Sequence, residues 1–400
     1  MSVDRILFFT GKGGTGKSVI SAATSLLLSE LGYDTLIISS DPAHSLSDAF
    51  QTTVNRDITR IRDNLYALNV DPVKEAAEHY GVLMDYIASI FRSRGVDELI
   101  AYELAAMPGM TGIATILKLD EVIHGQGFEC IVVDMVPSGE ALRFLYIPAL
   151  MGKISRRILK LASPIASMSK LLEPVVGLPA PDRESIDKGI ELVERIDRIK
   201  GLLLDHEVTS VRLVTNPDSF SINNTRRTYI QTLLYGLNPD LIIVNKVLPD
   251  SLENTYLSGW LSTQERLLND MESIFHPVPI RRLRLFDREL KGIDMLMEAA
   301  REIYGEDDPS KVFYRGGGIE VRHGDGELEI VYPIRHVDRD EIEIERIGDE
   351  LLVTLYTDMG PTTLVIPLPA ITYKMRLAKA RLINNRLHLI FIEEDGADAG

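Results

Sequence analysis

A glycine-rich stretch near the start of the chain, GKGGTGKS from Gly11 to Ser18, constrains the fold more than any other feature. It fits the spacing Gly-x-x-x-x-Gly-Lys-Ser, in which backbone N–H groups surround phosphates, the lysine reaches the outer phosphates and the hydroxyl binds Mg²⁺. An apolar run, residues 6–10, precedes it, and Ser18 to Leu31 is apolar at helical spacing and followed by Gly32. Strand, glycine loop and helix in this order predict a phosphate-binding loop.

Length and charge restrict the function classes. The chain has 400 residues, which predicts two or three folded units. Its net charge of −16 disfavours nucleic acid as a partner and leaves at most a transient contact with an anionic membrane. Apolar runs are far shorter than the ~20 residues of a spanning helix, and the strand pattern begins too early for a signal peptide, so we expect a cytoplasmic protein.

Strands and helices alternate along the first three quarters of the chain. This order predicts an α/β fold with a doubly wound parallel sheet, in a P-loop nucleotide-binding domain over residues 1–305. Two helical blocks, at about 72–125 and 141–206, are predicted as one inserted helical subdomain. The predicted strands are Arg5–Thr10, Thr35–Ser40, Leu65–Val70, Glu129–Asp134, Ser210–Thr215, Leu241–Asn245 and Val278–Arg284.

The pattern changes near residue 305. From there on, apolar and polar residues alternate with period two, and Gly324-Asp325-Gly326 and Asn384-Asn385 mark turns between the runs. An all-β sandwich over residues 310–395 is the predicted fold of this region.

A second lysine, Lys12, follows the first glycine of the loop, where an ordinary P-loop has no fixed chemistry. The stretch resembles the deviant Walker A motif of the SIMIBI-class ATPases. In that class, the resemblance implies, the extra lysine reaches across a homodimer interface to the partner's nucleotide, where a cation stabilises charge on the transferring phosphoryl group. The resemblance implies ATP or ADP with Mg²⁺ as ligands. The predicted nucleotide contacts are Gly11, Lys12, Gly13, Gly14, Thr15, Gly16, Lys17, Ser18 and Val19.

Two further segments resemble the ArsA/GET branch of this class. Asp41, in the stretch SSDPAHS after the second predicted strand, matches the switch I aspartate that positions the attacking water. Asp134 ends an apolar strand, at the position of a Walker B aspartate. The resemblance implies that Asp134 and Asp41 bind Mg²⁺ through water and that Ser18 binds it directly. Pro137 and Gly139 then match a switch II loop. The family usually has P-T-G-H-T here, whereas this chain has P-S-G-E-A.

The resemblance also implies residues that contact the nucleotide base. Asn245 closes a late strand, as does the family's adenine-binding asparagine, whose amide offers both a donor and an acceptor. Asp218, in Asn216-Pro217-Asp218, matches a nucleotide-contacting glutamate, although Asn-Pro-Asp is also a common turn. The carboxyl-terminal β region resembles the α-crystallin-like domain that some members carry.

Cysteine content separates the branches of the family. Trivalent arsenic needs converging thiolates, whereas Cys130 is the only cysteine and falls inside an apolar strand, which disfavours an arsenite pump. The Cys-x-x-Cys zinc clasp of the eukaryotic targeting factor is absent, so no zinc is expected. A partitioning ATPase of the ParA/MinD kind would need a basic face or a terminal amphipathic helix.

A client-binding ATPase is the interpretation that remains. Apolar stretches in the helical blocks, Tyr80–Phe91 and Arg157–Leu178, are candidate surfaces for hydrophobic protein clients such as transmembrane segments, although residue by residue ordinary helix core is the better explanation. We expect a homodimer in which ATP opens and closes a hydrophobic groove. The alternative is a nucleotide-gated scaffold that hydrolyses ATP poorly and uses the β domain for recognition.

Overall fold

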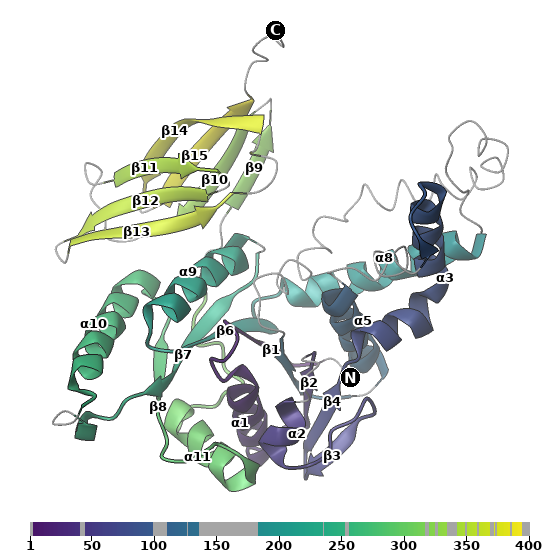
Figure 1. Cartoon of the computed structure of the whole chain (residues 1–400), viewed down its shortest axis with the longest axis horizontal. Coiled ribbons are helices and arrows are strands. Elements are labelled where there is room, and N and C mark those ends of the chain that lie inside the picture. Colours follow the sequence, from purple (N-terminus) through teal and green to yellow (C-terminus); the bar gives the residue numbers. More distant parts are fainter. Residues whose placement is uncertain are drawn as a thin grey trace. The chain divides into compact units, whose positions relative to one another are not determined.

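The computed structural model describes most of the chain. Its described residues are 3–40, 45–98, 110–125, 127–135, 183–234, 236–252, 256–316, 320–324, 327–333, 342–348, 350–357, 360–368, 372, 374–384 and 386–393. They form two compact units, residues 1–209 with 288–311 and residues 210–287 with 312–400. We call these unit 1 and unit 2 and describe each separately (Figure 1). In the described part of the chain, no helix combines the length and apolar composition that crossing a bilayer requires.

Unit 1 is an α/β layer with a mainly parallel sheet. Its strands lie in the order β3-β4-β2-β5-β1, and the β2–β4, β2–β5 and β1–β5 pairs are parallel. The five residues of β5 and the six of β1 are all buried, as expected for strands covered on both faces. The strands are β1 (Arg5–Thr10), β2 (Thr35–Ser39), β3 (Thr59–Arg62), β4 (Leu65–Asn69) and β5 (Cys130–Asp134).

The edge strand β3 differs from the expected parallel pattern. It pairs antiparallel with β4, and its sequence, TRIR, is only partly buried. A short polar edge strand carries little of the apolar signal by which buried strands are recognised.

Helices cover the sheet of unit 1. The hydroxyl groups of Thr24 on α1 and Tyr304 on α11 lie 2.9 Å apart in the buried interface between these two helices. A side-chain acceptor begins α3, because Asp71 accepts a hydrogen bond from Lys74 N at 3.1 Å and Pro72 occupies the first turn. The helices are α1 (Lys17–Glu30), α2 (Ser45–Phe50), α3 (Pro72–Ser93), α5 (Met110–Gly125), α8 (Arg183–Leu203) and α11 (Gly292–Tyr304).

The described helical insertion consists of α3, α5 and α8, which contact one another. A buried carboxylate, Asp120 on α5, holds α8 in place, because Arg195 Nε and Arg198 approach its Oδ2 atom at 3.1 and 2.9 Å. Arg195 also donates to the carbonyl of Leu117 at 2.9 Å. Described helices from both sides of β5 in the sequence therefore pack against one another.

The α/β part of unit 2 contains three parallel strands in the order β6-β7-β8. Arg212 and Asp240, both fully buried on β6 and β7, form an ion pair of 3.4 Å, and the Arg212 guanidinium also lies 5.1 Å from the centre of the Phe313 ring. The elements are β6 (Thr209–Thr215), α9 (Ser219–Leu234), β7 (Pro239–Val247), the 3₁₀ helix η1 (Asp250–Leu252), α10 (Ser258–Phe275) and β8 (Ile280–Arg284).

Two antiparallel sheets form the carboxyl-terminal part of unit 2, in the orders β14-β15-β10-β9 and β11-β12-β13. Their inner faces share one apolar core, which includes Ile330 and Phe391 from the first sheet, Val353 from the second, and Leu233 from α9. The strands are β9 (Glu320–Gly324), β10 (Glu327–Pro333), β11 (Ile342–Ile347), β12 (Glu350–Thr357), β13 (Gly360–Pro367), β14 (Met375–Ile383) and β15 (Arg386–Glu393).

Candidate functional site: a phosphate-binding loop between β1 and α1

The loop from Gly11 to Gly16 connects the buried strand β1 to α1, as the sequence predicted. Gly14 and Gly16 have φ angles of 82° and 89°, in the left-handed region that favours glycine. Gly16 is the N-cap of α1, so the chain turns sharply there before the helix begins. Larger residues at these two positions would strain the turn that exposes the loop's N–H groups.

The backbone carbonyl of Lys12 organises the loop. It accepts hydrogen bonds from the Thr15 amide at 3.4 Å, from Thr15 Oγ1 at 2.8 Å and from Lys17 Nζ at 3.3 Å. Lys17 is only 7% exposed, so its ammonium group lies inside the loop. Lys12 itself is exposed, as are Gly13 and Gly14. The two lysines therefore have different positions, one within the cradle and one at the surface.

The amino-terminal end of α1 is suited to an anion. No side chain caps it, and its first turn contains no acidic residue that would compete with a ligand. The first amides of the helix, those of Lys17, Ser18 and Val19, have no partner within a helix that starts there. These amides and the positive end of the helix dipole attract phosphate.

A hydroxyl from the next helix lies beside the predicted Mg²⁺ ligand. Ser45, the first residue of α2, donates to Ser18 Oγ at 2.9 Å. Ser45 carries no recognisable signal in the sequence, because only the folded chain brings these two residues together. The contact fixes the start of α2 at the start of α1.

Asp134 lies at the same end of the sheet as the loop. It ends β5 opposite Phe9 of β1 and Ser39 of β2, and its exposed fraction is 0%. Ser39 Oγ donates to Asp134 Oδ2 at 3.1 Å, and the Ser40 amide donates to the Asp134 carbonyl at 3.1 Å. This is the expected place for a carboxylate that holds the water shell of a metal ion. Ser39, which orients it, carried no recognisable signal in the sequence.

Three predicted residues lie outside the described residues: Asp41, Pro137 and Gly139. The described neighbours of Asp41 nevertheless lie at the site, because Ser40 bonds to Asp134 and Ser45 bonds to Ser18. The apolar stretch at 157–178 also lies outside the described residues.

The two predicted base-contacting residues belong to unit 2. Asn245 is buried on β7, and its Oδ1 accepts from the Lys246 amide at 2.8 Å. Asp218 directly precedes α9, and its Oδ1 accepts from the Ser221 amide at 2.9 Å. This bond gives Asp218 a helix-capping function. Contact of either residue with a nucleotide stays a prediction.

The described residues fit a nucleotide with its metal ion. Glycines with positive φ, a buried lysine and the uncapped start of α1 match phosphate, while Ser18 and the buried Asp134 carboxylate supply the oxygen atoms that Mg²⁺ prefers. Among the described residues, no three His, Cys, Asp or Glu side chains gather into a metal cluster. An ion here would be held mainly by one hydroxyl, water and the phosphates themselves.

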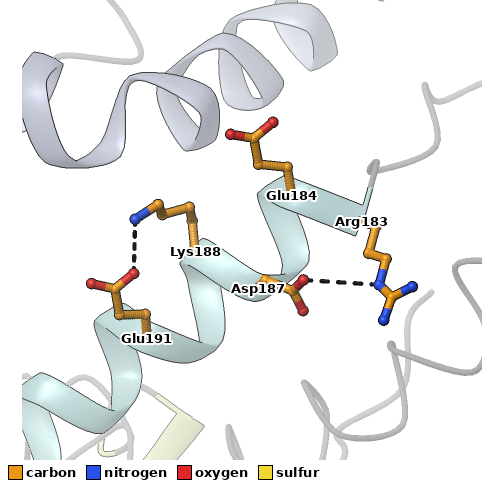
Figure 2. Close-up of a pocket in the computed structure, with 5 residues that line it drawn as sticks. All are labelled: Arg183, Glu184, Asp187, Lys188 and Glu191. Atoms are coloured by element: carbon orange, nitrogen blue, oxygen red, sulfur yellow. Dashed lines mark hydrogen bonds and ion pairs between the residues drawn. The ribbon is translucent and has the colours of Figure 1, made fainter.

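A depression in the surface lies at the start of α8, and Figure 2 shows that all five lining residues come from that helix. Lys188 and Glu191 form an ion pair of 2.8 Å, and Arg183 lies 3.9 Å from Asp187. Glu184 completes the lining. A depression with this charged lining is unsuited to an apolar client segment.

Comparisons with known proteins agree with the loop geometry. Residues 4–305 match the model of the family described as anion-transporting ATPase. A protein of Chlorobaculum tepidum with the provisional name arsenical pump-driving ATPase is 33% identical over 403 residues, covering 98% of this chain and 97% of that protein. The Arabidopsis thaliana protein named ATPase GET3A is 27% identical, covering 72% of this chain and 81% of its own length. A Dictyostelium discoideum protein named ATPase ASNA1 homolog is 25% identical over 76% of this chain and 91% of its length.

The family match covers the loop, the strand that ends at Asp134 and the described helical insertion. The Chlorobaculum relative extends the similarity through the two antiparallel sheets. With the phosphate-binding geometry described above, these findings identify the chain as an ATP-hydrolysing member of the anion-transporting ATPase family.

Proposed function

We propose that the protein is a homodimeric, ATP-driven switch that binds and releases hydrophobic protein clients in the cytoplasm. The proposal rests on the different positions of the two lysines of the loop. Lys17 is buried within the cradle, whereas Lys12 contributes its carbonyl to the loop and is exposed. An exposed lysine beside the phosphates is well placed to reach a second subunit's nucleotide.

Hydrolysis in this proposal uses groups at one end of the sheet. Lys17, the loop amides and the start of α1 would hold the phosphates. Ser18 directly, and Asp134 and Asp41 through water, would hold a Mg²⁺ ion, which would supply positive charge to the phosphates. Asp41 orients the attacking water. This assignment draws support from its described neighbours, since Ser40 bonds to Asp134 and Ser45 bonds to Ser18. Lys12 of the partner stabilises charge on the transferring phosphoryl group.

In this proposal, segments that change conformation with the bound nucleotide link hydrolysis to client binding. Residues 137 and 139 form the proposed switch II between β5 and the client-binding part of the helical insertion. The family resemblance assigns Asn245 and Asp218 to the nucleotide base. The hydrogen bond from Ser45 to Ser18 holds α2 beside the phosphate-binding loop. The functional division proposed here is an ATPase domain over 1–305 and a β domain over 310–395.

The choice of client rests on chemistry and on the relatives. GET3A and the ASNA1 homolog are named as ATPases. The resemblance of the sequence motifs to the ArsA/GET branch implies tail-anchored membrane proteins as clients. The provisional name of the Chlorobaculum relative suggests arsenicals instead. The only thiol, Cys130, has an exposed fraction of 0%, and burial raises its pKa to about 12. Soft-metal coordination by converging thiolates is therefore unsuited to this chain.

Binding of a labelled peptide to the full chain tests the proposal. The probe is a helical peptide of about 20 apolar residues, and the control has the same length with polar substitutions along one face. We expect the apolar peptide to bind with an affinity that differs between ATP and ADP, and Asp41→Asn to hold the ATP-bound state without hydrolysis. Equal, nucleotide-independent binding of both peptides would favour the nucleotide-gated scaffold and contradict the client-binding function.

A further inference from the structure

One edge of the β sandwich presents a row of cations. β14 is the outer strand of the sheet β14-β15-β10-β9. A register shift lies between Leu377 and Lys379, and beyond it Lys379, Arg381 and Ile383 occupy alternate positions and are exposed, as is Ala380 between them. We call Lys379 and Arg381 the basic row. Ile383, two residues further, is 43% exposed although it is apolar.

The other sheet presents a row of the opposite charge. β11 is the outer strand of the sheet β11-β12-β13, and its partly buried Ile342 and Ile344 pack against the sandwich core. Glu343 and Glu345 alternate with them and are exposed. We call this pair the acidic row. Ile347, two residues further along the same face, is 55% exposed.

Both rows lie at the same edge of the sandwich. Arg346, near the end of β11, donates to the carbonyl of Thr372 at 2.9 Å and to the carbonyl of Met375 at the start of β14. This arginine therefore joins the two outer strands, one from each sheet. Figure 1 shows β11 and β14 on the same side of the paired sheets.

The rows are not neutralised within their own sheets. Across the ladders, the acidic row faces uncharged residues, and the basic row faces one uncharged residue and one histidine whose ring bonds to Glu329 at 2.8 Å. Among the described residues, no ion pair involves either row. The ladder partners are Thr354, Leu352, Ile390 and His388.

We propose that this edge is a self-complementary interface at which a second copy of the chain docks. A two-fold axis through the edge exchanges the two sheets, so the acidic row of each copy meets the basic row of the other. The spacing is matched, because Glu-x-Glu-x-Ile on β11 and Lys-x-Arg-x-Ile on β14 have the same period. In a parallel register, Glu343 meets Lys379, Glu345 meets Arg381 and Ile347 meets Ile383.

Charge complementarity and the position of the rows favour this occupant. Cations on an outer strand commonly prevent unwanted edge-to-edge pairing, but that function requires no acidic row of equal spacing on the adjoining strand. An acidic peptide would satisfy the basic row and leave the acidic row and Ile347 uncovered. A second copy covers both rows and both isoleucines. Because of the two-fold symmetry, the contact between an acidic row and a basic row occurs twice in the dimer. The contact is independent of the ATP-dependent closure proposed above and persists without nucleotide.

Cysteine pairing tests the register directly. Ile347→Cys and Ile383→Cys are made in separate full-length chains, mixed without nucleotide and oxidised. Laterally adjacent residues on paired strands have Cβ atoms about 4.5–5.5 Å apart, close enough for a disulfide after a small adjustment. We expect a covalent heterodimer in the mixture and little product from either variant alone. Cys130 does not interfere, because it is fully buried.

Charge reversal tests the energetics. Reversing the basic row (Lys379→Glu, Arg381→Glu) is expected to weaken nucleotide-free association at least about tenfold in sedimentation equilibrium, because four attractive pairs per dimer become repulsive. Reversing the acidic row to lysine in the same chain restores complementarity and association. The control reverses two exposed arginines outside the sandwich, Arg266 and Arg301, and leaves association unchanged.

Two results would overturn the proposal: no disulfide in the cysteine mixture, or a nucleotide-free association that the basic-row reversal does not change. Because these experiments contain no ATP, their failure leaves ATP-dependent dimerisation intact. Conversely, loss of ATP-dependent closure with a normal disulfide would reject the proposed switch alone.

Discussion

Cys130 provides a quantitative test of whether arsenicals are ligands of this chain. The thiol belongs to the first residue of β5 and has an exposed fraction of 0%, and burial raises its pKa from 9.0 to about 12. At pH 8 this change lowers the thiolate fraction about 1000-fold, and the thiolate is the form that attacks disulfide reagents and binds soft metals. We therefore expect Ellman's reagent to label the native protein at least about 1000-fold more slowly than the urea-unfolded chain.

Burial of the only thiol also predicts the response to arsenite. ATPase activity of the wild type should not change when arsenite is added, and Cys130→Ala should retain that activity, with a moderate loss of stability from the small cavity. The assay measures phosphate release with and without arsenite in both proteins. Rapid labelling of the native thiol, or arsenite stimulation that disappears in Cys130→Ala, would refute the reasoning from burial.

Two further predictions concern stability. Asp240→Asn removes the negative charge that the fully buried Arg212 faces, so we expect the free energy of unfolding in urea to fall by about 3–5 kcal/mol. Phe313→Leu changes only the packing against Arg212 and is expected to cost less. Equal losses from the two substitutions would contradict an explanation based on charge. The hydrogen bond from His388 lowers the pKa of the Glu329 carboxyl below 4.5, so its contribution to stability is present above pH 4.5 and is lost as pH falls through the lowered folded value. Thermal unfolding from pH 3 to 6 should show this acid dependence in the wild type and a weaker one in His388→Gln.

Local sequence signals were sufficient for the central strands and the phosphate-binding loop. Apolar runs such as 6–9 and 131–133 are buried strands, and the glycines at 14 and 16 adopt the positive φ angles that their motif implies. Strand β3 was missed because four partly exposed residues carry no clear period. Helix α11 was not predicted either, although its buried face packs against α1 through Tyr304.

Contacts between distant segments were not predictable from the sequence. Ser45 and Ser39 look like ordinary serines until the fold brings them to Ser18 and Asp134. Arg212 and Asp240 are charged residues in strand sequences, and only the pairing of β6 with β7 explains their burial. Packing of Leu233 from α9 into the sandwich core likewise depends on tertiary structure, since an amphipathic helix does not specify which surface it covers.

The central claim is that Lys12 acts on the partner subunit's nucleotide. Lys12→Ala should preserve the loop, because the contacts from Thr15 and Lys17 go to the Lys12 carbonyl. We expect ATP binding to remain and hydrolysis to fall by about 10³-fold, in line with the contribution of a cation supplied in trans, whereas Lys12→Arg retains charge as the matched control.

The most direct measurement is the ATPase rate of mixed dimers of Lys12→Ala and Asp41→Asn subunits. Each variant alone is expected to be inactive, whereas in a mixed dimer one site has an intact Asp41 and receives the partner's intact Lys12. The account predicts recovery of up to a quarter of the wild-type rate at equal subunit concentrations, because about half of the dimers are mixed and each has one working site. No recovery in mixtures with demonstrated subunit exchange, or full hydrolysis by a strict monomer, would contradict action in trans.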